Sequence, residues 1–174
     1  MFDVVLWQPE IPPNTGNLMR LTVNTGCRLH LIEPLVFDLD DARMRRAGLD
    51  YRGFASVTLH GSFDAYIDTN PSQIFAFTQH ASVLYSDVAY EPGDSLLFGR
   101  ESDGLASEVV DHPCISERVR IPIAPDGRSL NLANAAAGQT LPRAGSTRLR
   151  LHPPRWRTRT NVWPGRMPCR GYRS

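Results

Sequence analysis

The chain contains no lysine, so all 19 of its basic residues are arginines. Its three cysteines, Cys27, Cys114 and Cys169, lie far apart and form no CxxC pair. Neither they nor the five histidines have metal-ligand spacing, so we expect no metal site, and unpaired thiols favour a reducing compartment. No run approaches the roughly 18 apolar residues of a membrane span, and Asp3 interrupts the first apolar run, so we expect neither a signal peptide nor a membrane contact. These absences together predict a cytoplasmic protein.

Acidic residues are missing from the last part of the chain. All 18 Asp and Glu residues lie in 1–137 together with ten arginines, which gives this part a net charge of −8. Residues 138–174 carry nine arginines and no acidic residue, a net charge of +9. An acidic body with a basic tail indicates either a nucleic-acid arm or a foreign segment. At 174 residues the chain is long enough for one domain with a core and hardly for two.

Strand and helix patterns alternate along residues 1–137. Short apolar, β-branched runs predict strands at 2–7, 28–34, 56–60, 73–78, 95–99 and 118–123. Amphipathic segments and capping residues predict helices at 14–26, 40–50, 62–69, 104–112 and from 129 onward. This alternation predicts an α/β fold with a mostly parallel sheet covered on both faces. Ligands of such folds bind beyond the carboxyl ends of the strands, so we expect the site in the loops after Trp7, Thr78, Phe98 and Ile121.

The loop after the first strand, "PPNTGNLMR", places Asn14, Asn17 and Arg20 in the first turns of a helix. One interpretation is a capped helix with a solvated arginine. The other is that backbone N–H groups and Arg20 face an anion such as a phosphate. No GxGxxG is present, which disfavours a dinucleotide-binding oxidoreductase.

Two later loops also combine glycine with polar residues. "LLFGRESDGL" places Gly99 at a strand end, before Glu101 and Gly104, and these glycines either admit a ligand close to the backbone or form a plain turn. "RIPIAPDGRSLNLAN" places Ser129 and Asn131 at the start of the last helix, where each polar residue either caps the helix or contacts a ligand.

Together these loops closely resemble the three signature motifs of the SPOUT superfamily, the trefoil-knotted RNA methyltransferases that use S-adenosylmethionine. The matching stretches are "PEIPPNTGNLMRL", "LLFGRESDGL" and "RIPIAPDGRSLNLANA", in this order and spacing. The opening "VVLWQPEIPPNTGNLMRLTVNTGCRLHLIEP" and "RRAGLDY" at 45–51 look most like the small single-domain group that methylates the ribose 2′-oxygen of the tRNA wobble nucleotide. The resemblance covers a SPOUT methyltransferase domain at about 1–137.

The resemblance implies an α/β knot fold, a homodimer whose RNA site is assembled from both chains, and the anticodon region of tRNA as partner. It places the catalytic arginine at Arg20 with Asn17 beside it, and Glu101 or water as the group that takes the ribose proton. S-adenosylmethionine would leave as S-adenosylhomocysteine. The cofactor pocket that the resemblance implies uses Phe77, Thr78, Gly99, Glu101, Gly104, Ile121, Ser129, Leu130, Asn131 and Asn134.

The match to the family stops after Ala137, where relatives continue with a long apolar helix. Here Gly138, Pro142 and Gly145 follow, and these residues predict that the helix ends. Residues 138–174 are either a basic RNA-binding arm or the product of a shifted reading frame. The second interpretation is favoured because Arg, Pro and Gly are the residues that a GC-rich gene encodes when it is read out of frame. If the helix is lost, we expect poor folding, a monomer or an inactive chain.

Other functions remain open. Within the superfamily, the chain could be a relative that methylates another tRNA or rRNA ribose. Outside enzymes, it could be a catalytically silent RNA-binding protein that uses the Arg-rich tail. Binding of S-adenosylmethionine separates these hypotheses, because an enzyme of this class must hold the cofactor and a pure RNA binder need not.

Overall fold

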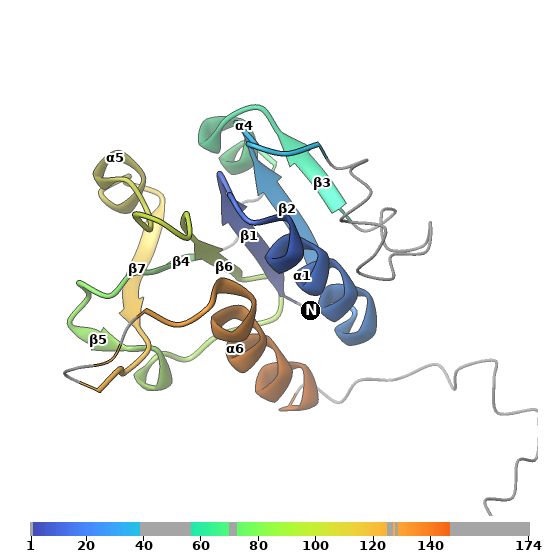
Figure 1. Cartoon of the computed structure of the whole chain (residues 1–174). Helices are drawn as coiled ribbons and strands as arrows, with labels where there is room; N and C mark the ends of the chain where they lie inside the picture. Colours follow the sequence, from blue (N-terminus) through green and yellow to red (C-terminus); the bar gives the residue numbers. More distant parts are fainter. Residues whose placement is uncertain (1, 39–56, 70–72, 125–126, 128, 147–174) are drawn as a thin grey trace, which may run out of the picture.

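A computed structural model describes residues 2–38, 57–69, 73–124, 127 and 129–146 (Figure 1). Its strands are β1 (Asp3–Trp7), β2 (Arg28–Ile32), β3 (Val57–His60), β4 (Ile74–Phe77), β5 (Val83–Leu84), β6 (Ser95–Phe98) and β7 (Ile115–Arg120). Its helices are α1 (Pro12–Thr25), α4 (Phe63–Ile67), α5 (Ser107–Val110) and α6 (Leu132–Ser146), with a 3₁₀ turn at Tyr85–Asp87. The strands form one sheet in the order β3-β2-β1-β6-β4-β7-β5, and every neighbouring pair is parallel. The predicted α/β fold with a parallel sheet is confirmed.

The strand β1 lies near the middle of the sheet and sorts its side chains between two cores. All five residues of β1 are buried, as expected for a parallel strand covered on both faces. Because successive side chains of a strand alternate, Val4 and Leu6 enter one core whereas Val5 and Trp7 enter the other.

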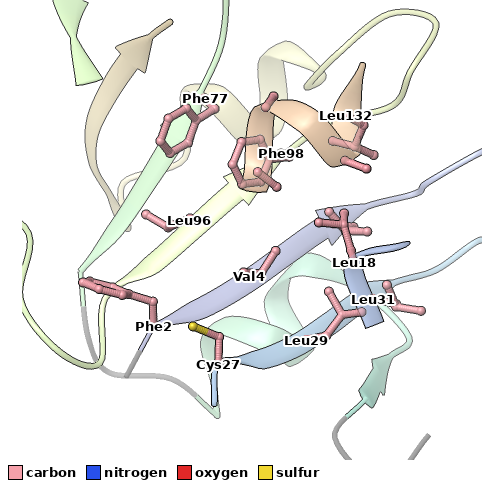
Figure 2. Close-up of a cluster of buried hydrophobic side chains, with 14 of the residues drawn as sticks. Phe2, Val4, Leu18, Cys27, Leu29, Leu31, Phe77, Leu96, Phe98 and Leu132 are labelled. Carbon is pink, nitrogen blue, oxygen red and sulfur yellow. The ribbon is translucent and has the colours of Figure 1, made fainter. Parts of the chain in front are cut away.

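The helices α1 and α6 pack side by side over the first of these faces (Figure 1). Figure 2 shows Leu18 of α1 and Leu132 of α6 among the side chains of this core. At its upper end the rings of Phe77 and Phe98 stack with centroids 4.6 Å apart. This core therefore lies directly beneath the carboxyl ends of β4 and β6, where the ligand site was expected.

The helices α4 and α5 cover the opposite face. Phe63 and Tyr66 of α4 and Val109 of α5 are buried against the strands there. The helix α4 begins at Ser62, whose hydroxyl accepts a hydrogen bond from the Ala65 amide, so the predicted helix at 62–69 is present in shorter form.

The helix α1 begins at Pro12, two residues before the predicted start, and ends next to Gly26 as predicted. Proline stands in its first turn, and Gly26 follows the helix with φ of 74°, the left-handed conformation that favours glycine. Leu18 and Thr22 are fully buried on the predicted face. The Thr22 hydroxyl donates to the Leu18 carbonyl at 3.0 Å, so this buried hydroxyl is hydrogen-bonded.

The last helix differs from the prediction. We expected it to end at Gly138, but α6 continues through Gly138 to Ser146. Gln139 and Thr140 are buried, and Thr140 donates to the Ala136 carbonyl at 2.7 Å. Packing of α6 against α1 therefore outweighs the low helix propensity of these residues.

Other elements were missed or lie elsewhere. The strand β5 has only two residues and the 3₁₀ turn after it three, both too short for a periodic signal. The predicted helix at 104–112 is reduced to Ser107–Val110. The predicted helix at 40–50 and tail residues 147–174 lie outside the described residues.

A polar cluster lies at the β1–β2–β3 side of the α4 face, with Asp3, His30 and His60 buried and Arg28 exposed. Arg28 holds Asp3 through two hydrogen bonds, and His30 Nδ1 lies 2.9 Å from His60 Nε2. Burial would raise the pKa of the Asp3 carboxyl, but His30 and Arg28 outweigh it and lower that pKa from its ordinary value. Burial, with a smaller contribution from His30, lowers the pKa of His60. Both shifts make the folded state more stable in neutral than in acidic solution.

These shifts predict that acid destabilises the protein before its carboxylates titrate. The unfolded chain binds a proton at His60 near the ordinary histidine pKa of 6.5, whereas the folded chain resists it. The free energy of unfolding should therefore be level above that pH and fall as the pH drops below it. Urea unfolding at about pH 7.5 and about pH 5.5 measures this difference. We expect His60→Gln to reduce it and the exposed control His80→Gln to retain it; equal differences in wild type and His60→Gln would contradict the assignment.

Candidate active site

A cleft of about 820 Å³ opens at the carboxyl ends of β4, β6 and β7. The residues that line it come from the loops after β1, β4, β6 and β7 and from the start of α6. It lies next to the boundary between β1 and β6, where the chain from β1 leads to β2 on one side and the chain from β6 leads to β7 on the other. The four loops in which the site was expected all contribute to one cavity.

The structure brings most of the predicted cofactor residues together. Those that line the cleft are Phe77, Thr78, Gly99, Glu101, Gly104, Ile121, Ser129, Leu130 and Asn131. Asn17, Arg20 and Asn134 are exposed and do not line it. The backbone N–H of Asn134 donates to the Asn131 side chain at 3.2 Å, so Asn131 caps the start of α6.

The two glycines of the loop after β6 line the cleft, and the backbone of the loop itself also requires them. A Cβ on Gly99 would collide with the backbone of Gly104 and Leu105. Arg100 and Gly104 exchange two backbone hydrogen bonds of 3.0 and 3.1 Å, and Gly104 has φ of 75°. Glycine is required at 99 because the loop folds back on itself, and at 104 because of the left-handed backbone.

The start of α1 does face an anion, and that anion is the carboxylate of Glu101. Its Oε2 accepts from the Glu10 amide at 2.7 Å, and its Oε1 accepts from the Ile11 amide at 3.3 Å and from Asn14 Nδ2 at 2.9 Å. These two amides belong to the residues just before α1, because the helix itself opens with Pro12 and Pro13, which carry no N–H. Glu101 therefore accepts from backbone N–H groups that one of the two interpretations of the sequence gave to an anion such as a phosphate.

Asn14 connects all three signature loops. It is 5% exposed, donates to Glu101 after β6, and accepts at Oδ1 from Asn131 Nδ2 at 2.8 Å. Its amide thus uses a donor toward one loop and an acceptor toward the other. The three segments that shape the cleft are held together by this side chain.

Apolar side chains also reach the cleft. Ile11, Ile123 and Leu130 line it and are 43%, 37% and 48% exposed. Large apolar groups that remain exposed in a cavity favour a ligand with an apolar or aromatic part.

Several contacts at the mouth were not predicted. Ser102 donates to the Glu10 carboxylate, and Arg100 donates to the Gln8 side chain and lies with its guanidinium carbon 5.0 Å from the centre of the Trp7 ring. Gln8 itself has φ of 50°, which is uncommon for a residue with a side chain. Glu10 and Ser102 both lie in loops that follow strands, and this position was the one feature of the sequence that could have indicated them as site residues.

The cleft's chemistry is that of polar side chains and backbone groups. Among the described residues no group of three or more His, Cys, Asp or Glu could hold a metal ion. In the same part of the chain, no helix combines the length and apolar character needed to cross a membrane.

Comparison with known proteins identifies the family. Residues 1–138 match the model of the SpoU rRNA Methylase family. The tRNA (cytidine(34)-2′-O)-methyltransferase of Burkholderia pseudomallei is 54% identical over 140 residues, covering 79% of this chain and 90% of the relative. The protein of the same name from Escherichia coli K12 is 49% identical over 138 residues, covering 79% and 88%.

A solved structure agrees with these relatives. A protein described in a study of 2-OH methylation of C/U34 on tRNA superposes with a TM-score of 0.75 at 40% identity, covering 83% of this chain and 94% of that one. The matching region contains the sheet, the three joined loops and the cleft. This chain belongs to the SpoU methylase family within the SPOUT superfamily.

Proposed function

We propose that the protein transfers a methyl group from S-adenosylmethionine to the ribose 2′-oxygen of nucleotide 34, the wobble position of a tRNA. The observation that carries this proposal is the cleft at the carboxyl ends of the parallel strands, because its lining lies within residues 1–138 that match the family. Relatives that are 54% and 49% identical to this chain are named for that reaction. S-adenosylmethionine supplies a methyl group on a positively charged sulfur, and S-adenosylhomocysteine is the product.

The cleft fits the two halves of this cofactor. Leu130 and Ile123 provide exposed apolar surface for the adenine ring. Ser129 and Asn131 at the start of α6, with Thr78 after β4, offer hydroxyl, amide and backbone groups for the ribose and the amino-acid part. Phe77, Gly99, Gly104 and Ile121 complete the walls at the strand ends.

Methyl transfer is a single displacement, so the protein's main task is to hold the ribose in line and remove its hydroxyl proton. Correct positioning alone lowers such barriers by roughly 7–11 kcal/mol. We assign this task to Arg20, whose guanidinium stays protonated and therefore orients the 2′-hydroxyl and a neighbouring phosphate instead of acting as the base. Asn17, one turn earlier on α1, supports the same contact.

The proton acceptor follows from the contacts of Glu101. Both of its carboxylate oxygens already accept hydrogen bonds, from two backbone amides and from Asn14. We therefore assign to Glu101 the role of joining the loops. Water, the other expected acceptor, would then take the proton from the ribose hydroxyl.

Arg20 and Asn17 also support a homodimer. Both are exposed on α1 and lie outside the cleft of their own chain. A second copy that presents its α1 across the cleft would bring its Arg20 to the ribose, so we propose that the RNA site is assembled from two chains.

The position of methylation distinguishes this proposal from its alternatives. We expect the chain to transfer labelled methyl groups from S-adenosylmethionine to a tRNA transcript, reaching at most one group per tRNA. A matched transcript with a 2′-deoxynucleotide at position 34 should accept none, because the reacting oxygen is missing. Incorporation into this control would indicate methylation at another position of the tRNA. Cofactor binding without transfer to either transcript would indicate another RNA substrate or a silent RNA-binding protein.

Arg20→Lys tests the orienting role. A lysine keeps the charge but cannot make the paired contacts of a guanidinium, so turnover should fall by about 100-fold or more. The dissociation constant for S-adenosylhomocysteine should stay within about twofold, because Arg20 lies outside the cleft. Arg118→Lys, at an exposed arginine paired with Asp111 at 2.8 Å, is the matched control. Wild-type turnover in Arg20→Lys would refute the role.

A further inference from the structure

The loops after β1 and β6 exchange carboxylates. Glu101 reaches from the β6 loop to the backbone amides of Glu10 and Ile11. Glu10 reaches back to the β6 loop, where its Oε2 accepts from the Ser102 amide and its Oε1 from the Ser102 hydroxyl, both at 3.0 Å. We call these four hydrogen bonds, together with the one from Asn14 to Glu101, the loop clasp.

The clasp brings two negative side chains onto neighbouring loops. Like charges this close repel each other unless each is compensated separately. Glu101 is compensated by the N–H groups of the β1 loop and the Asn14 amide, and Glu10 by those of Ser102. Because each loop's carboxylate is held by the other loop's donors, separating the two loops would break all of these hydrogen bonds together.

The clasped residues form one wall of the cleft. Ile11 and Asn14 line it from the β1 side, and Glu101 and Ser102 line it from the β6 side. Glu10 itself does not line the cleft, and it is bound to the one serine of the β6 loop that does.

We propose that Glu10 is a positioning residue for the cofactor: acting through Ser102, it holds the β6 loop against the start of α1 and so fixes the wall of the cleft that binds S-adenosylmethionine. This inference rests on the proposed function. Glu10 does not line the cleft, so it acts on the cofactor site only through Ser102.

The ionisation of Glu10 agrees with this arrangement. The hydrogen bonds from the Ser102 hydroxyl and amide, with a smaller contribution from the charge of Arg100, lower the pKa of Glu10 from its ordinary value. The acceptor form of the side chain is therefore the one present at neutral pH.

Titration of purified variants with S-adenosylhomocysteine tests the proposal. Glu10→Ala removes both acceptors and should weaken binding by about tenfold. Ser102→Ala should weaken it as well, and the double variant should bind no more weakly than Glu10→Ala, because both changes break the same contact. Glu10→Gln should bind within about threefold of wild type, because its amide accepts from the Ser102 amide and donates to the Ser102 hydroxyl, which can turn to accept.

Two further measurements separate positioning from a general loss of structure. The KM for S-adenosylmethionine should rise about tenfold in Glu10→Ala while kcat stays within about twofold. Glu91→Ala, at an exposed glutamate before β6 and so at the opposite end of that strand, should leave KM and binding unchanged.

Unchanged binding by Glu10→Ala, or additive losses in the double variant, would overturn the role of Glu10 alone. If the wild-type protein binds no S-adenosylhomocysteine, the proposed function fails and the positioning role fails with it. The wild-type titration thus distinguishes the two failures.

Discussion

The side chain of Asn14 is the contact on which the rest of the site depends. A parallel sheet brings the ends of its strands to one edge, but it does not fix the loops that follow them. Asn14 is buried where three of those loops meet, and its amide satisfies Glu101 with its donor and Asn131 with its acceptor. A side-chain amide carries both a donor and an acceptor, so one residue can hold two loops at once. The cleft exists because these loops are held at fixed distances from one another.

The same arrangement explains how the acidic part of the chain, residues 1–137, can present a site for a positively charged cofactor and an anionic RNA. The carboxylates of Glu101 and Glu10 are each bound by N–H groups of the neighbouring loop. Both carboxylates are therefore engaged in joining the loops, and the sheet beneath keeps the donors in place. Arginine for the RNA comes from the exposed face of α1 in the proposed dimer. The trefoil knot remains a prediction; the order of the strands, with β7 between β4 and β5, agrees with a late segment that crosses an earlier one.

The sequence predicted the sheet and the location of the site, because buried parallel strands are continuous apolar runs and their carboxyl ends share an edge. It could not predict β5, which is two residues long, or the continuation of α6 through Gly138, which tertiary packing decides. Nine predicted cofactor residues line the cleft, whereas the sequence could not predict the hydrogen-bond partners of Asn14 and Glu10. Asn131 is 117 positions from Asn14, and Ser102 is 92 from Glu10. Such pairs have no periodicity, so only the fold shows them. The two interpretations of residues 138–174, an RNA-binding arm or a frame-shifted product, likewise stay predictions.

The most direct test of this account is calorimetric titration of Asn14→Asp with S-adenosylhomocysteine, beside the wild-type chain. Aspartate keeps the shape of the side chain and the acceptor for Asn131, but it replaces the donor to Glu101 with a second negative charge. We predict that the wild-type chain binds and that the variant, still folded by its thermal melt, binds at least about tenfold more weakly. Equal affinity of the two proteins would contradict the claim that the join at Asn14 forms the cofactor site.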